Sequence, residues 1–285
     1  MLKNGSIKKI KPALKHYIVM TLTSIFILLP FYWMFITSIK PSNEVMLSPP
    51  TYFPKVLNFS NYIEVWSTLP LLKYMANSLY VSVMSTIISV VLATLCGYSI
   101  SRFAKRKLQK STVVLMLLSQ LIPGVLPFIS FYFIMFRAGL TNTYAGLIIA
   151  YSMWGIPFCT LMIKSYFSSA IPVSLEESAT IDGCTRFGIF IKIALPISLP
   201  GVVATAIFSF ILAWNEFMWA SVILSNNDLK PAAIGIYDYI GQFGGNSNMA
   251  LTMTTSVLIT LPAIILFAIL QKYLISGLTA GAVKG

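Results

Sequence analysis

Charged side chains are scarce in this sequence. Only 10% of the 285 residues are Asp, Glu, Lys or Arg, whereas a soluble domain carries about 25%. Hydrophobic residues make up 57% of the chain, and the mean hydropathy is +0.81. This composition argues against a soluble enzyme, a disordered chain and a secreted disulfide scaffold. It indicates a protein whose main solvent is a lipid bilayer.

Residues that commonly bind metals or perform catalysis are also rare. The sequence has one histidine, His16, and three cysteines, Cys96, Cys159 and Cys184, none of which falls in a C-x-x-C pattern. It contains no H-E-x-x-H motif, no G-x-S-x-G motif and no carboxylate pair near the histidine. We therefore expect no disulfide framework, no metal site, no cofactor and no catalytic residue in this chain.

Six apolar runs are long enough to cross a membrane as helices. About 20 helical residues span a bilayer core of about 30 Å. The predicted spans are residues 17–39, 77–100, 112–136, 144–163, 201–224 and 251–271. The first run is longer than the apolar core of a signal peptide and lacks a small-residue cleavage site, so we interpret it as a retained span. The predicted fold class is an all-α membrane protein with six transmembrane helices.

The basic residues in the gaps between spans predict the orientation. The gaps on the side of the two termini contain 15 Lys and Arg residues, and the alternate gaps contain 5. Because cytoplasmic loops are enriched in these residues, both termini are predicted to be cytoplasmic. The resulting division is a cytoplasmic tail over 1–16, a first span over 17–39, an extracytoplasmic loop over 40–70, a five-span core over 71–272 and a cytoplasmic tail over 273–285. The basic residues lie in short gaps rather than on one face, so no nucleic-acid partner is predicted.

A long cytoplasmic gap contains a helix-turn-helix pattern, which we call the elbow (residues 168–200). Ser174 and Glu177 form an S-x-x-E capping box, which predicts a helix from Leu175 to about Ile181. Asp182 and Gly183, which follow, are expected to end that helix.

The second half of the elbow carries its own helix signals. Thr185 is predicted to cap a second helix, and Pro196 and Pro200 are expected to end it before the fifth span. A simple connector lying on the bilayer surface needs only a few residues, and this segment has more than thirty. Docking of another protein is therefore the favoured interpretation, with a surface connector as the alternative.

The elbow resembles a known family signature. Glu177-Ser178-Ala179, three residues, Gly183, nine residues and then Ile193-x-Leu195-Pro196 is similar to the EAA signature E-A-A-x3-G-x9-I-x-L-P of ABC importer permeases. The one departure is Ser178, where the family usually has alanine. The sequences around Ile181-Asp182-Gly183 and Trp214-Asn215-Glu216-Phe217 resemble the carbohydrate, maltose-type branch of that family.

The resemblance implies a type I ABC importer fold in a bacterial inner membrane. It also implies four partners: a second permease, two cytoplasmic ATPase subunits that bind ATP and Mg, and an extracytoplasmic sugar-binding protein. By analogy, the residues expected to couple this chain to the ATPase are Leu175, Glu176, Glu177, Ser178, Ala179, Asp182, Gly183, Ile193, Leu195 and Pro196. Independently, the sequence has no G-x-x-x-x-G-K-[ST] motif, so it cannot cradle ATP phosphates by that route.

Asn215 and Glu216 are polar residues in the predicted fifth span, and two interpretations stay open. They can lie on the translocation path or at the contact with the binding protein, or they can be a hydrogen-bonded pair that fixes helix packing. The predicted cargo is a sugar or an oligosaccharide, with glycerol phosphate or a polyol as alternatives. An ion-coupled secondary transporter is disfavoured because Glu216 is the one Asp, Glu, Lys or Arg residue within the six predicted spans.

Overall fold

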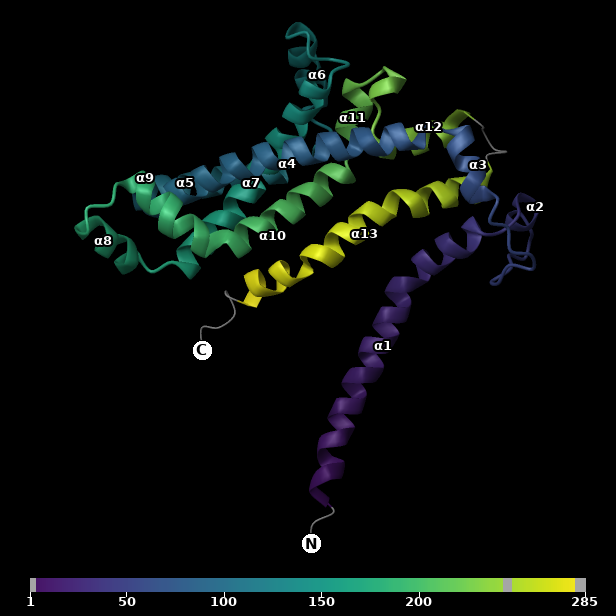
Figure 1. Ribbon diagram of the computed structural model, residues 1–285, viewed down its shortest axis with the longest axis horizontal. Coiled ribbons are helices and arrows are strands. Elements are labelled where there is room, and N and C mark those ends of the chain that lie inside the picture. The colour runs from purple at the N-terminus through teal and green to yellow at the C-terminus, as the bar shows by residue number, and fades with distance from the viewer. Residues whose placement is uncertain (1–3, 243–247, 280–285) are drawn as a thin grey trace. The chain divides into compact units, whose positions relative to one another are not determined.

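The computed structural model describes the backbone of residues 4–242 and 248–279 and the side chains of residues 16–237 and 248–271. Within these residues every regular element is a helix. The elements, in chain order (Figure 1), are α1 (Asn4–Ser38), α2 (Ser42–Val45), α3 (Asn61–Thr68), α4 (Leu71–Arg102), α5 (Arg106–Leu121), α6 (Phe128–Arg137), α7 (Tyr144–Ala170), α8 (Val173–Ile181), α9 (Arg186–Ile189), the π-helical segment η1 (Phe190–Ala194), α10 (Leu195–Trp214), α11 (Met218–Ile223), the 3₁₀ turn η2 (Asn227–Leu229), α12 (Ala232–Gln242) and α13 (Met249–Thr279).

Five helical stretches are long and apolar enough to cross a membrane. They are His16–Ser38, Leu71–Arg102, Tyr144–Ala170, Arg186–Trp214 and Met249–Gln271. These stretches overlap the first, second, fourth, fifth and sixth predicted spans. The chain is therefore an all-α, multi-pass membrane protein.

The prediction of one continuous helix over 112–136 is wrong. Helix α5 ends at Leu121 and α6 begins at Phe128. The segment between them contains Pro123 and Pro127. Proline has no backbone N–H to donate, and its ring clashes with the preceding turn of a helix. Two prolines four residues apart thus divide the apolar run into two shorter helices.

The predicted bounds of the fifth span, 201–224, are also wrong. The helical stretch that begins at Arg186 continues through η1 and α10 to Trp214, so Pro196 and Pro200 lie inside it rather than at its end. Pro196 follows the π-helical turn of η1 directly, and a local π-helical adjustment of this kind allows a helix to continue past a proline that donates no N–H. Pro200 lies further inside α10. Past Trp214 the chain leaves the helix and starts the short α11.

The chain forms two compact units. The first unit comprises residues 1–70 and 238–260, and the second comprises residues 71–237 and 261–285. In the second unit α4, α7 and α10 lie side by side (Figure 1) and form most of its interior.

The backbones of α4 and α7 approach closely at Gly97. A Cβ atom added there would lie 3.0 Å from the backbone nitrogen of Lys164 and 3.3 Å from the carbonyl oxygen of Thr160. A larger residue would therefore require the α7 backbone to shift by some tenths of an ångström. Next to this point lies an apolar cluster of Ala93, Tyr98, Cys159, Ile163, Phe167, Ile171, Phe190 and Ala194. Glycine and the cluster together hold the two helices as one packed pair.

The first unit contains an ordered polar loop after α1. The Glu44 carboxylate accepts hydrogen bonds from the Lys55 backbone N–H at 3.0 and 3.1 Å and from the Thr51 hydroxyl at 2.7 Å. These donors lower the pKa of Glu44 below its ordinary value of 4.5, the Lys55 N–H most of all. The Lys40 ammonium bonds to the Thr51 carbonyl and stands over the Trp33 ring, 5.0 Å from its centroid. The predicted loop 40–70 is therefore folded on itself.

Candidate functional site

The elbow contains two helices joined by a turn. Its first helix, α8, begins at Val173, directly after Pro172, which occupies the N-cap position and makes no side-chain cap. Ser174 therefore lies inside the first turn, and the predicted capping role of Ser174 is wrong. Pro172 already has the φ of −62° that leads into a helix, and this places the start two residues earlier than the capping box suggests.

The turn of the elbow depends on a left-handed glycine. Gly183 has a φ of +83°, a conformation that costs a residue with a side chain about 1–2 kcal/mol. The Gly183 N–H bonds to the Thr180 carbonyl at 3.1 Å, and the Cys184 N–H bonds to the Ala179 carbonyl at 2.9 Å. These two bonds form a Schellman motif, which satisfies the free carbonyls at the end of α8. The expected break at Asp182 and Gly183 is confirmed.

The second helix of the elbow starts with a side-chain cap. The Thr185 hydroxyl accepts a hydrogen bond from the Gly188 N–H at 3.1 Å, which confirms the capping prediction. The helix then continues through the π-helical segment η1 into α10. The elbow is thus joined directly to a long apolar helix.

The elbow residues predicted to couple to an ATPase fall into two groups. Glu176 and Ala179 are buried, and Ile193 and Leu195 are partly buried. The exposed group consists of Leu175, Glu177, Ser178, Asp182, Gly183 and Pro196. Two apolar side chains beside them are also exposed, Ile181 at 86% and Phe187 at 70%. The elbow therefore presents an acidic and apolar face around Glu177, while Glu176 points into the protein.

Glu176 forms a buried ion pair with Arg102, the last residue of α4. The Arg102 Nε atom lies 2.7 Å from the Glu176 carboxylate, and the two side chains are 7% and 11% exposed. The Tyr98 hydroxyl donates to the same carboxylate at 3.1 Å. Sequence reasoning missed Arg102 and Tyr98, because no spacing rule connects a glutamate to an arginine 74 residues earlier in the chain.

Asn215 and Glu216 lie where α10 ends. Asn215 is exposed, and its side-chain amide donates to the Ile211 carbonyl of its own helix at 2.8 Å. The Glu216 carboxylate accepts from the backbone N–H of Trp219 at 2.8 Å and of Ala220 at 3.2 Å. Glu216 therefore satisfies the free N–H groups at the start of α11.

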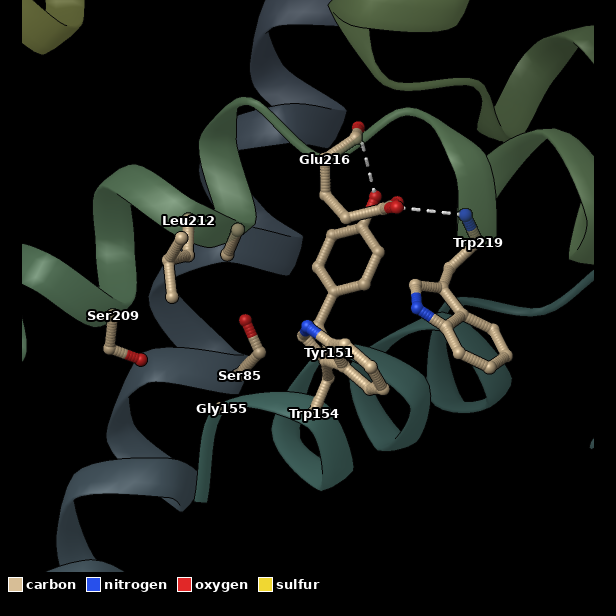
Figure 2. Close-up of a pocket in the computed structure, with 9 residues that line it drawn as sticks. Ser85, Tyr151, Trp154, Gly155, Ser209, Leu212, Glu216 and Trp219 are labelled. Atoms are coloured by element: carbon tan, nitrogen blue, oxygen red, sulfur yellow. Dashed lines mark hydrogen bonds between the residues drawn. The ribbon is translucent and has the colours of Figure 1, made fainter. Parts of the chain in front are cut away.

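A small cavity adjoins Glu216 (Figure 2). The Tyr151 hydroxyl points toward the Glu216 backbone carbonyl and donates to it at 3.4 Å. The remaining lining residues are Ser85, Trp154, Gly155, Ser209, Leu212, Ala213 and Trp219. The cavity has a volume of about 30 Å³, which is roughly the share of one water molecule. It is too small for a sugar ring. Among the described side chains, no three or more His, Cys, Asp or Glu residues gather as a metal site would require.

Comparisons with known proteins agree with this geometry. A family model described as a binding-protein-dependent transport system inner membrane component matches residues 89–279. The sulfoquinovosyl glycerol transport system permease protein SmoH of Agrobacterium fabrum is 34% identical over 258 residues, which cover 90% of this chain and 89% of SmoH. The diacetylchitobiose uptake system permease protein DasC of Streptomyces coelicolor is 34% identical over 256 residues, covering 90% and 91% of the two chains.

A solved structure has the same fold. It is the crystal structure of a bacterial ABC transporter involved in the import of the acidic polysaccharide alginate, with a TM-score of 0.76 and 22% identity over 96% of this chain and 98% of that chain. The family model and the two relatives confirm the resemblance carried by the elbow signature. The chain therefore belongs to the inner membrane components of binding-protein-dependent transport systems, the permeases of ABC importers.

Proposed function

We propose that this chain is the permease of an importer that takes up a sugar or an oligosaccharide at the expense of ATP. The cargo class is supported by the names of the relatives, which transport sulfoquinovosyl glycerol and diacetylchitobiose, and by the alginate importer of similar fold. The binding protein implied by the family delivers the cargo from outside. This chain carries no cofactor and catalyses no reaction, and ATP and Mg bind to the partner ATPase.

The exposed face of the elbow is the docking site for an ATPase subunit. One observation carries this proposal: Glu177, Ile181 and Phe187 are all exposed on a helix-turn-helix whose shape is held by Gly183 and Thr185. An exposed carboxylate and large exposed apolar side chains on one small element suit a protein cleft that offers a basic group and an apolar wall. In the assembled transporter two ATPases would dock, one on the elbow of each permease.

A second permease completes the translocation path. The cavity beside Glu216 is far too small for a sugar. The described side chains of α4 include large apolar residues that are exposed, such as Leu79, Ile87 and Leu95. These side chains are available for lipid or for another membrane subunit. Glu216, which lines the cavity, and Asn215, the residue before it, would then stand near this path or near the binding protein.

The orientation follows from the basic residues. With 15 Lys and Arg on the side of the termini and 5 on the other, the tails 1–16 and 273–285 and the elbow 168–200 face the cytoplasm. The loop 40–70 is extracytoplasmic, and residues 71–272 form the transport core. This arrangement places the elbow on the side where ATP is available and the polar loop on the side of the binding protein.

The test is purification in mild detergent followed by identification of the co-purifying chains. We expect an ATPase, a second permease and, in proteoliposomes, hydrolysis that is stimulated by a sugar-loaded binding protein. The variant Glu177→Lys should lose the ATPase, because it reverses the charge at the centre of the exposed elbow face. Glu64→Lys is the matched control, since Glu64 is an exposed glutamate on α3 in the other unit. Uptake that continues without any ATPase contradicts the proposal.

A further inference from the structure

Arg102 connects three helices through a single guanidinium group. Its Nε atom bonds to Glu176 of α8. Its Nη2 atom donates to the carbonyl of Phe167 at 3.0 Å and to the carbonyl of Ile171 at 2.8 Å, both at the end of α7. Arg102 itself ends α4. The carbonyls in the last turn of a helix have no partner within the helix, and a cation is favoured there. One side chain thus joins the ends of α4 and α7 to the elbow.

The connection lies in a closely packed setting. The Tyr98 ring, whose hydroxyl also bonds to Glu176, lies 5.2 Å from the Phe167 ring and 5.0 Å from the Phe190 ring, measured between centroids. At the residue before Tyr98, Gly97 lets α4 approach the α7 backbone so closely that an added Cβ atom would lie 3.0 Å from the backbone nitrogen of Lys164. The base of the elbow is therefore fastened to a pair of helices that cannot slide past each other without breaking packing.

The outer part of the elbow is more exposed than its base. Residues 180–187 are all exposed, and they include the turn at Gly183. The guanidinium of Arg186 stands over the Phe103 ring, 5.2 Å from its centroid. The outer end of the elbow is thus exposed, and its inner end is held by buried polar contacts. A force applied at the outer end of the elbow is transmitted along α8 to the contacts on the buried side of α8. The charged contact there is the ion pair between Glu176 of α8 and Arg102 of α4.

We propose that Arg102 and Glu176 are positioning residues that fasten the elbow to α4 and α7, so that a displacement of the elbow moves both helices together. This proposal rests on the proposed function, in which an ATPase grips the exposed face of the elbow. It assigns to neighbouring glutamates different tasks: Glu177 meets the partner, and Glu176 transmits the motion.

Arginine has a specific advantage at this position. Its planar fork directs Nε and Nη2 to two different targets at once, the Glu176 carboxylate and the α7 carbonyls. Lysine has a single ammonium group on a flexible stem and cannot hold both targets in fixed directions. Arg102→Lys therefore keeps the charge and removes the rigid connection, which makes it a sharper variant than a truncation that also empties buried space.

The experiment uses the complete transporter in proteoliposomes, with both permeases, the ATPases, the binding protein and the cargo sugar. The measured quantities are the amount of co-purifying ATPase, the rate of ATP hydrolysis and the number of sugars imported per ATP. For Glu176→Gln and Arg102→Lys we expect normal ATPase association and hydrolysis, with the sugars imported per ATP reduced about tenfold, a typical size for coupling between sites. Glu177→Gln is the matched control in the same helix and should instead reduce ATPase association.

The outcomes are distinguishable. A normal sugar-to-ATP ratio in both variants overturns this proposal and leaves the proposed function intact. A lower yield of assembled transporter with an unchanged ratio per complex also overturns it, because a purely structural role changes the amount of complex and not its coupling. A wild-type preparation that contains no ATPase overturns the proposed function, and this inference falls with it.

Discussion

Two buried carboxylates, one in each unit, are stabilised by different means. Glu44 takes its hydrogen bonds from Thr51 and Lys55, which are 7 and 11 residues away in the sequence. Glu176 takes its bonds from Tyr98 and Arg102, which are 78 and 74 residues away. The first carboxylate shapes its own loop, and the second joins helices that are distant in the sequence.

The comparison teaches how a carboxylate's partners decide what it can do. The donors to Glu44 include a backbone N–H that belongs to the same loop, so the network closes a local turn. The partner of Glu176 is the guanidinium of Arg102 on another helix. Removing Arg102 leaves the buried charge of Glu176 without a counter-charge. The hydrogen bonds of Glu44 suit a loop that must keep its shape. The Arg102–Glu176 pair suits a contact that makes α4 and α8 move together.

The largest expected effect is that of Arg102→Ala. This change leaves Glu176 buried and unpaired and frees the α7 carbonyls, so we expect the free energy of unfolding to fall by about 3–5 kcal/mol. Thermal unfolding in detergent, followed by tryptophan fluorescence, measures it. Arg137→Ala is the control, because Arg137 is exposed at the end of α6 and stands over the Phe133 ring. An equal fall in the free energy of unfolding for the two variants would mean that the buried ion pair stabilises the protein no more than an exposed arginine does.

A smaller loss is expected for Gly183→Val. A β-branched residue at a φ of +83° costs about 1–2 kcal/mol, and the cost should be confined to the elbow. Hydrogen exchange of the α8 amides should therefore accelerate, while the amides of α4 keep their rates. Gly183→Asn should have a weaker effect, since asparagine tolerates the left-handed region. Unchanged exchange in α8 would contradict the role of this turn.

Glu44 should respond to acid in a predictable direction. Its pKa is lowered in the folded protein, mainly by the Lys55 backbone N–H, so the stability it contributes is present above about pH 4.5 and is lost as the pH falls through the folded pKa. The difference in melting temperature between the wild type and Glu44→Gln should therefore shrink below pH 4.5. A difference that stays constant down to pH 3 would show that the charge of Glu44 adds nothing. The loss for Glu44→Gln should remain below that for Arg102→Ala.

The smallest effects separate the two hydroxyl residues of the elbow. Thr185→Ala removes an observed cap, so we expect a loss of about 1 kcal/mol. Ser174→Ala removes a hydroxyl that does not cap α8, so we expect a change within about 0.5 kcal/mol. Thermal unfolding of the two variants side by side gives the comparison. A larger loss for Ser174→Ala would restore the capping box that the sequence suggested.

Local features of the chain were predictable from short stretches of sequence. The break of α8 at Gly183 and the cap at Thr185 depend on residues within three or four positions of each other, and the apolar runs predict membrane helices from length and hydropathy. Pro123 and Pro127 were visible as helix breakers too, yet their combined effect on the third span was underestimated. In contrast, the helix continues through Pro196 and Pro200, with a π-helical turn directly before Pro196, and no composition rule indicates such a turn.

Composition and residue spacing are enough to predict the membrane class, the helical content and the EAA-like elbow, because each is a property of short stretches of the chain. The direction of Glu176, inward to Arg102, and of Glu177, outward, depends on how the helices pack. The two glutamates are adjacent and chemically alike, and α8 separates them by turning about 100° per residue. Which side of α8 faces α4 and α7 depends on packing among residues far apart in the chain. The sequence of α8 alone therefore does not predict which of the two glutamates is buried.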